Sequence, residues 1–187
     1  MKKNVTGLDS RIKMAADVIM NGVCQPMGMA FHNTWHFECI KPDGSLRWEH
    51  TQSNIIVNTG LDDVLNVYFK AGTGPSLFVG LKDTGTPVAA DTMALHASWA
   101  TISPYSNATN PALTMGTVAS QSVDNSASKA TFNINATDEI FGAFITDNST
   151  VDAATGLLYG VVNFGASRNV VNLDTLNVTV TATNASV

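Results

Sequence analysis

The clearest helical pattern of apolar residues begins just after Asn58. Apolar side chains recur there at i, i+3, i+4, i+7 and i+8, so they share one face of a helix. The residues on this face are Leu61, Val64, Leu65, Tyr68 and Phe69. Thr59 precedes them as a candidate N-cap, and two glycines and a proline within residues 72–75 end the segment. The pattern predicts one short helix near residues 60–70 whose apolar face is buried.

Beyond residue 75 the apolar residues alternate with polar ones, which is the period of a β-strand. The alternation is cleanest at 176–181, and further strand candidates lie at 77–82, 99–105, 113–123, 132–136 and 157–164. Residues 140–145 form a nearly continuous apolar run, as in a buried central strand. Turn residues separate these segments. Strands that recur about every 10–20 residues predict a mainly β fold, an antiparallel β-sandwich of the jelly-roll or immunoglobulin-like kind.

Residues 34–50 predict a β-hairpin that opens this sandwich. Trp35 and Phe37 alternate with polar residues, a Pro-Asp-Gly turn follows at 42–44, and the alternation resumes at Leu46 and Trp48. Residues 55–57 add a short apolar strand before the helix. We therefore expect a β-sandwich domain at residues 31–187. The residues expected in its core include Leu61, Leu65, Phe69, Val79, Ile134, Phe144, Val162 and Val178.

Residues 1–30 differ from the rest of the chain and predict a partly helical N-terminal arm. Several apolar residues fall on one face of a short helix over residues 10–21, and methionines follow it. Two interpretations stay open: the arm packs on the flank of its own domain, or it packs on a neighbouring subunit. The candidate interaction residues of the arm and of the hairpin are Ile12, Ala16, Ile19, Met27, Met29, Trp35 and Trp48.

The charge balance argues against binding to nucleic acid. The 187 residues contain 10 Lys and Arg against 15 Asp and Glu, and only 13% of the residues are charged. Residues 1–30 carry four basic against two acidic residues, a net of +2, whereas residues 58–187 carry four against ten, a net of −6. A domain of this sign does not attract nucleic acid. Charges interrupt the first residues, and no apolar run is long enough to span a bilayer, so we expect synthesis in a cytoplasm and no membrane partner.

The reactive side chains form no recognisable catalytic or metal site in the sequence. His32 and His36 would lie about 13 Å apart along a strand, too far to share one metal ion with Cys39. Cys24 and Cys39 are expected to be free thiols. The adjacent carboxylates at 138–139 would point to opposite faces of a strand, whereas a catalytic pair must face one substrate. The sequence therefore predicts no cofactor, no metal and no catalytic residues.

Three successive motifs resemble a family of virion proteins. After a hairpin with a tryptophan and an Asp-Gly turn, VNTGLDDVLNVYF is followed by LFVGLKDTGTPVAADT and then by SVDNSASKATFNINATDEIFGAFI. Their order over residues 31–182 is similar to that in small structural proteins of tailed bacteriophages. The resemblance implies a non-enzymatic virion component of the kind called a decoration, cement or minor structural protein. It brings no catalytic residues with it.

The resemblance also implies a location and partners. We expect a homo-oligomeric decoration protein, made in the host cytoplasm, that binds the major capsid protein or other virion proteins on the outer surface of the head. Two alternatives stay open: a tail, collar or head-fibre component, and a carbohydrate-binding β-sandwich at a fibre tip. The second alternative would use Trp35, Trp48 and Trp99 as a sugar platform, although packing across strands is the commoner use of aromatic residues in a hairpin.

Overall fold

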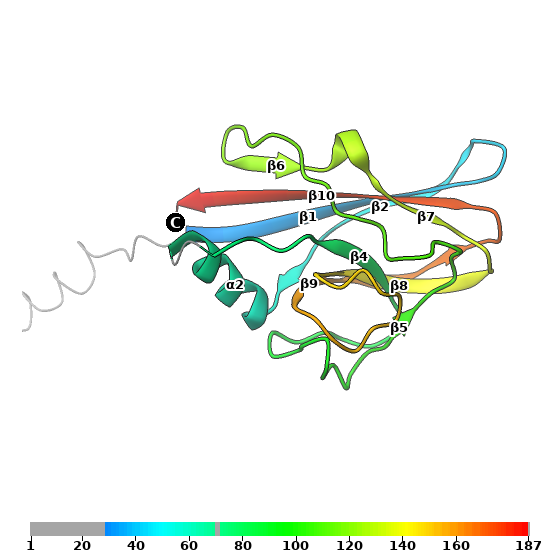
Figure 1. Ribbon diagram of the computed structural model, residues 1–187. Helices are drawn as coiled ribbons and strands as arrows, with labels where there is room; N and C mark the ends of the chain where they lie inside the picture. Colours follow the sequence, from blue (N-terminus) through cyan, green and yellow to red (C-terminus); the bar gives the residue numbers. More distant parts are fainter. Residues whose placement is uncertain (1–28, 70–71, 187) are drawn as a thin grey trace, which may run out of the picture. The chain divides into compact units, whose positions relative to one another are not determined.

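The computed structural model describes residues 29–69 and 72–186 (Figure 1). The chain divides into two units, one of residues 32–183 and the other of residues 1–31 with 184–187. The first of these units holds two antiparallel sheets and the helix α2. The predicted fold class, a mainly β antiparallel sandwich with a short helix near residues 60–70, is confirmed.

Each sheet has five strands. The first sheet runs in the order β2, β1, β10, β6, and β7 also pairs with β10. Its strands are β1 (Met29–Ile40), β2 (Leu46–Ser53), β6 (Ser122–Asp124), β7 (Ala130–Asn133) and β10 (Thr175–Ser186). The second sheet runs in the order β3, β9, β8, β4, β5. Its strands are β3 (Ile55–Ile56), β4 (Phe78–Lys82), β5 (Thr101–Ile102), β8 (Asp138–Thr146) and β9 (Leu158–Val170). The helix α2 spans Asn58–Phe69, and a 3-10 turn, η1, spans Ser126–Ser128.

β1 and β2 form the predicted hairpin. In its turn, Asp43 Oδ1 accepts hydrogen bonds from the backbone N–H of Ser45 at 2.9 Å and from its hydroxyl at 2.7 Å. Gly44 adopts a φ of +82°, a left-handed conformation that glycine takes at no steric cost. Every second residue of β1 from Trp35 to Cys39 is then fully buried, as the alternation predicts.

The two sheets face each other across one apolar core (Figure 1). Phe37 of β1 meets Phe164 of β9 edge-on, with their ring centroids 4.8 Å apart. Tyr105 meets Phe132 of β7 in the same way at 4.9 Å. Such edge-to-face pairs add to the stabilisation that the buried area provides. Five of the predicted core residues are buried: Val79, Ile134, Phe144, Val162 and Val178.

β8 is buried on both faces, which explains its continuous apolar run. Ala143 and Ile145 belong to the core between the sheets, whereas Phe144 points the other way. The apolar side chains on that other side, here called the outer cluster, are Val57, Met93, Trp99, Phe144, Leu158 and Val161. The Phe144 and Trp99 rings lie 5.6 Å apart. Gly80 pairs with Phe144 and leaves room for its ring, because a Cβ at Gly80 would come within 2.2 Å of it.

One side chain fills a gap in the first sheet. β7 pairs with residues 175–178 of β10 and β6 with residues 181–183, so the two do not form one continuous strand. Between them lies the buried Asn125, whose Nδ2 donates to Val178 O at 3.1 Å and whose Oδ1 accepts from Val180 N–H at 2.6 Å. The asparagine amide thus takes the place of a backbone peptide and satisfies the polar groups of β10.

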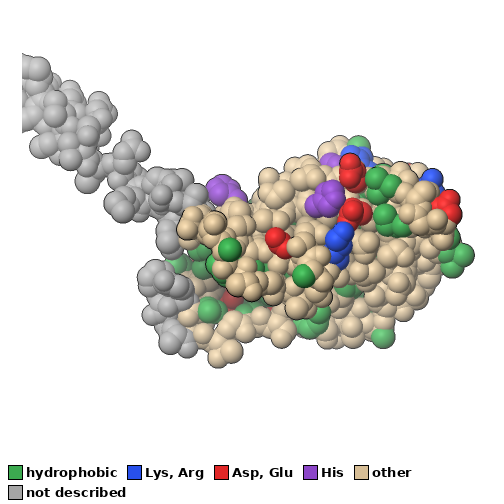
Figure 2. Space-filling view, turned by 90° about the horizontal axis from the view of Figure 1, so that it is seen from above, with side chains coloured by type: hydrophobic (Ala, Val, Ile, Leu, Met, Phe, Trp, Pro, Cys, Tyr) green, Lys and Arg blue, Asp and Glu red, His purple; other side chains and the backbone are tan. Residues whose placement is uncertain are grey.

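The outer face of the first sheet is polar. Every second residue of β10 from Leu176 to Val180 is buried, and the residues between them are partly exposed. Figure 2 looks onto the side of the molecule that carries β6 and β10, and it shows mainly uncharged side chains and backbone, with a few acidic, basic and histidine side chains next to one another. A solvated face of this kind agrees with the small charged fraction of the sequence.

Two predicted strands are much shorter than expected. The candidate at 99–105 contains only β5, and the candidate at 113–123 is irregular until β6 begins at its end. The start of this irregular segment lies along β4 instead, where the backbone N–H of Val79 donates to Pro111 O and that of Leu113 donates to Leu77 O. These single hydrogen bonds pair backbone groups of the segment without the regular hydrogen-bond ladder of a β-strand.

Replacing Phe144 with alanine should destabilise the fold, because this change removes the ring that joins β8 to the outer cluster. We expect Phe144→Ala to lower the free energy of unfolding by about 3–5 kcal/mol. In a domain of this size that corresponds to a fall in melting temperature of roughly 10 °C. Leu95→Ala, at a side chain that is 69% exposed, is the matched control and should shift it little. Equal melting temperatures for the two variants would contradict the burial of Phe144.

Candidate functional site

The helix α2 lies against β9 at a glycine, Gly60. Gly60 is buried, and a Cβ at this position would lie 2.2 Å from Tyr159 O, so only glycine allows this close approach. Thr59 Oγ1 donates to Leu158 O at 2.7 Å. The helix begins at Asn58, so the prediction of Thr59 as the N-cap is wrong. The Thr59 hydroxyl ties the first turn of the helix to β9 instead.

The apolar face that the sequence predicts on α2 is turned partly to solvent. Leu61 is 40% exposed and Leu65 is 52% exposed, so the prediction that both lie in the core is wrong. The Phe69 side chain lies outside the described residues. Leu61 and Leu65 are exposed because the contact at Gly60 brings a different side of α2 against β9. Val64 and Val67 are half-buried. Leucines at 61 and 65 are four residues apart and share the exposed side of the helix.

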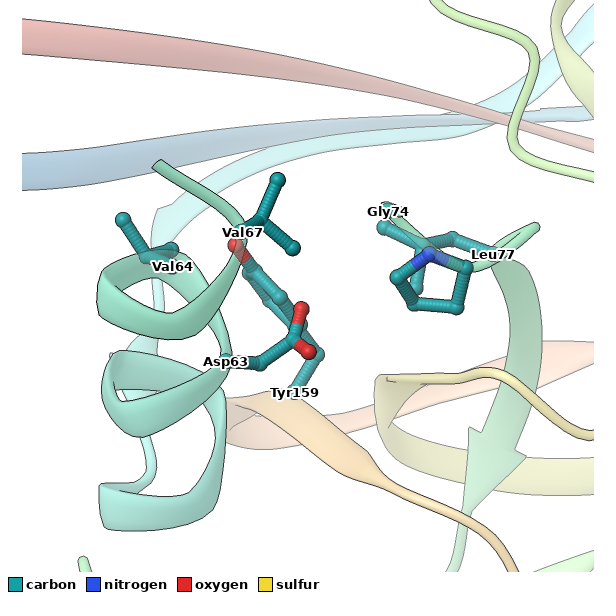
Figure 3. A pocket seen from close by; sticks show the side chains of 7 residues that line it. Asp63, Val64, Val67, Gly74, Leu77 and Tyr159 are labelled. Carbon is teal, nitrogen blue, oxygen red and sulfur yellow. The ribbon is translucent and has the colours of Figure 1, made fainter. Parts of the chain in front are cut away.

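A pocket of about 250 Å³ lies beside the helix (Figure 3). It is lined by Asp63, Val64, Val67, Gly74, Pro75, Leu77 and Tyr159. Figure 3 shows the Asp63 carboxylate directed from α2 into the space in front of Gly74 and Leu77. Burial, and then the charge of Asp63, raise the pKa of Tyr159. The pocket is therefore apolar on most sides, with one carboxylate at its wall.

The pocket, together with Leu61 and Leu65, is called here the α2 surface. It holds a single carboxylate and no second titratable partner beyond Tyr159 among its described lining residues. Such a surface suits the binding of an apolar group with a basic neighbour better than a reaction that needs two facing catalytic groups. The sequence did not reveal it, since the helical pattern alone predicts a buried face. One residue in the sequence hinted at the pocket: Val67 is apolar but does not belong to the predicted apolar face of the helix.

The residues predicted for interaction fall in different places. Ile12, Ala16, Ile19 and Met27 lie outside the described residues, and Met29 is the first residue of β1. Trp35 is fully buried and stacks on Phe37, so it belongs to the core rather than to a surface that a partner can reach. Trp48 is half-buried, and its Nε1 donates to Asn169 O at 2.6 Å. Of the two tryptophans, Trp35 therefore belongs to the core and Trp48 is bound to β9, while the residues of the arm stay a prediction.

A partly buried ion pair lies between the hairpin and the turn before β10. Arg47 donates from Nε at 2.6 Å and from a terminal nitrogen at 3.0 Å to the two oxygens of Asp174, which has no exposed side-chain surface. The backbone N–H of Val171 and the thiol of Cys39 also donate to this carboxylate. Burial alone would raise the pKa of Asp174, but these hydrogen bonds outweigh burial and hold the pKa below its usual range. Burial, and then Asp174 itself, raise the pKa of Cys39 to about 12.

Lys82 is a second buried charge, at the end of β4. It has no exposed surface, and its Nζ donates to three oxygens. These are Asp83 O at 2.8 Å, Gly85 O at 2.6 Å and Asn163 Oδ1 at 2.8 Å. Burial lowers the pKa of Lys82 to about 8, while the charge of Asp83 acts in the opposite direction. The ammonium group can donate three hydrogen bonds, and here each of them meets an acceptor.

Two more buried polar residues brace loops. Asp91 accepts from Trp99 Nε1 at 2.9 Å and so fixes the loop that covers the outer cluster. Asn110 accepts from the Tyr105 hydroxyl at 2.8 Å and donates to Thr150 O at 3.1 Å. Because Trp99 is only 6% exposed, its ring is not available as a platform for sugar. These polar groups hold the fold together.

Histidines and cysteines do not cluster in the described part of the chain. His32 is exposed, and His36 Nδ1 lies 3.0 Å from Thr51 Oγ1. Across residues 29–69 and 72–186, no three His, Cys, Asp or Glu side chains are grouped so that they could hold a metal ion. No helix in these same ranges combines the length and the apolar character that crossing a membrane requires.

Comparison with known proteins adds no relative. No protein-family model matches the chain, and no curated protein is similar to it in sequence. The function must therefore be argued from the residues and their geometry.

Replacing Asp174 with asparagine should destabilise the protein at neutral pH. The change leaves the shape of the side chain but removes the charge that Arg47 meets, so we expect the melting temperature to fall by several degrees. Because the folded-state pKa of Asp174 is lowered, its contribution is complete above the unfolded value of about 3.9 and is lost as the pH falls through the folded value. The difference between wild type and Asp174→Asn should thus shrink below about pH 4 in thermal melts. A difference that is as large at pH 3 as at pH 7 would contradict this role.

Proposed function

We propose that this chain is a non-enzymatic structural protein of a tailed-bacteriophage virion, a decoration protein that binds the capsid shell through the α2 surface. The observation that carries the proposal is the exposure of Leu61 and Leu65 on the same helix whose Val64 and Val67 line an apolar pocket, in a domain whose core does not include the two leucines. Exposed apolar side chains that gather on one element of a fold mark a candidate site of protein interaction. The proposed partner is the major capsid protein on the outer surface of the head.

The resemblance to virion proteins supports this proposal at the same place in the chain. The first motif, VNTGLDDVLNVYF, contains the whole of α2, and the second motif, LFVGLKDTGTPVAADT, begins at Leu77 in the wall of the pocket. The two motifs that lead the resemblance therefore build the α2 surface. This coincidence links a likeness in sequence to one definite surface of the fold.

The use of the buried polar groups supports a structural rather than a catalytic role. Lys82, Asp91 and Asp174 are each buried and each bonded to other parts of the fold. A catalytic group needs a substrate within hydrogen-bond reach, and these groups are occupied by the chain itself. Their bonds join loops to strands, which suits a domain that must stay rigid within a larger assembly.

A tail or collar position is the competing assignment within the virion. The number of copies per particle separates the two, because a decoration protein covers a repeating shell and a tail part does not. Quantitative mass spectrometry of purified virions should find copies of this protein in proportion to the shell protein. A small number of copies per virion, unrelated to the number of shell proteins, would indicate a position in the tail. The glycan-binding alternative would need a surface other than a platform of Trp35 and Trp99, since both are buried.

Polar replacement of the two exposed leucines should weaken attachment without unfolding the domain. Glutamine suits a helix, so the double variant Leu61→Gln and Leu65→Gln should keep its circular dichroism spectrum. Losing the burial of two leucines removes about 3 kcal/mol, so we expect binding to capsids that lack this protein to weaken roughly a hundredfold. Co-sedimentation with such capsids measures the loss.

A matched control uses apolar residues that are exposed elsewhere. Leu95 is 69% exposed and Val118 is 70% exposed, and neither lines the pocket. The variant Leu95→Gln and Val118→Gln removes the same kind of surface and should bind as wild type does. Equal binding by both double variants would show that the α2 surface is not the attachment site.

Deleting residues 1–29 tests the N-terminal arm separately. The arm carries a net charge of +2 and residues 58–187 a net of −6, so the arm should be drawn to an acidic neighbour, either another copy or the shell. We expect the truncated chain to fold, by circular dichroism, but to lose self-association in sedimentation velocity and to bind capsids more weakly. A truncated chain that binds as tightly as the full one would make the arm a flank of its own domain.

A further inference from the structure

Lys82 and Asn163 bring an amine and a carboxamide into contact within the second sheet. Lys82 Nζ lies 2.8 Å from Asn163 Oδ1. Since a C=O bond is about 1.2 Å long, Cγ of Asn163 lies no more than about 4 Å from this nitrogen. Atoms that are about to react in an enzyme site are held about 3–3.5 Å apart. The two atoms are therefore within about an ångström of the separation at which reacting atoms are held.

A glycine makes this contact possible. Lys82 of β4 pairs with Gly142 of β8, and Gly142 pairs with Asn163 of β9, so the three residues form one row across three strands. Because Gly142 has no side chain, the lysine can reach across β8 to the asparagine. A Cβ at Gly142 would lie 2.0 Å from Val162 O, so a larger residue cannot occupy the middle of the row.

The surroundings suit a nucleophilic lysine. Lys82 has no exposed surface, and two backbone oxygens, Asp83 O and Gly85 O, hold its Nζ in place. Because burial lowers the pKa of Lys82 to about 8, about a tenth of the molecules carry the neutral amine at pH 7. A desolvated neutral lysine is a competent nucleophile. Fixed contact with the acyl group replaces the encounter of two free reactants.

We propose that Lys82 and Asn163 react with each other in the folded protein and form an intramolecular isopeptide bond. Lys82 first loses to solvent the proton that it donates to Asn163 Oδ1, and the lone pair left on Nζ then attacks Cγ of Asn163 and forms the new Nζ–Cγ bond. The proton that Nζ sheds passes to Nδ2, the Cγ–Nδ2 bond breaks with its electron pair on nitrogen, and ammonia leaves. The product is a secondary amide, and the step needs no oxidant, cofactor or second substrate. Asn163 is half-buried, which gives the ammonia a path to solvent.

The reaction should be slow and should follow folding. No carboxyl group in the described part of the chain is hydrogen-bonded to the Asn163 side chain, so no acid assists the departure of ammonia. The rate should rise with pH as Lys82 loses its proton, and about tenfold between pH 7 and pH 9. The bond would tie β4 to β9 across β8 and close a loop over residues 82–163. Such a cross-link restricts the unfolded chain and should raise the melting temperature.

Intact mass spectrometry of the full-length protein tests the proposal. The chain is purified, incubated for a week at about pH 9, where the amine form predominates, and then denatured. We expect a mass lower by one ammonia than the mass before incubation. Trypsin should then fail to cleave after Lys82, and residues 71–129 should be recovered joined to residues 130–168 as one branched peptide.

Two variants separate this bond from other losses of ammonia. Lys82→Arg keeps a charged donor but offers no amine nucleophile, and it should keep its full mass. Lys129→Arg alters a lysine at the surface and should lose ammonia as the wild type does. Loss of ammonia that persists in Lys82→Arg would point to cyclisation at an asparagine such as Asn21, which precedes a glycine. That result, or an unchanged wild-type mass after the incubation, would overturn the proposal.

Discussion

Burial of both faces of β8 is the constraint on which the rest of the structure depends. Its alternate residues, Ala143 and Ile145, complete the core between the sheets, while Phe144 requires a second apolar layer on the other side. The chain supplies that layer with Met93 and Trp99 from the long connection after β4. This connection covers the second sheet before the chain enters β5, which pairs with β4. The helix α2 is left beside the end of β9, with its leucines facing outward.

Covering a sheet with irregular chain creates polar groups that must be satisfied inside the fold. Lys82 meets the carbonyl oxygens of the connection, and Asp91 fixes Trp99 within it. On the other sheet Asn125 replaces a missing stretch of strand, and Asp174 gathers donors from the hairpin. Lys82, Asn125 and Asp174 each join segments far apart in the sequence, whereas Asp91 acts within the connection itself. The domain is therefore braced by polar contacts as well as by its two apolar layers.

The periodicity of apolar residues predicted the strands in which burial follows a regular pattern along the chain. The hairpin with its Asp-Gly turn, the run at 140–145 and the alternation at 176–181 all appear as expected. The outward turn of Leu61 could not be predicted, because a 3.6-residue stripe does not say whether a sheet is available to cover it. The ion pair was invisible for another reason: Arg47 and Asp174 are 127 residues apart and meet only in the folded chain. Of the candidate site, the sequence predicted the helix but not the pocket beside it.

We propose that α2 and the pocket beside it are the part of this domain that binds the virion shell. Hydrogen–deuterium exchange of the full-length protein, free and bound to capsids that lack it, tests this most directly. We expect binding to slow exchange in α2 and in the segment around Gly74 and Leu77, while exchange on the outer face of β10 is unchanged. Protection confined to the polar face of the first sheet, with α2 unaffected, would contradict it.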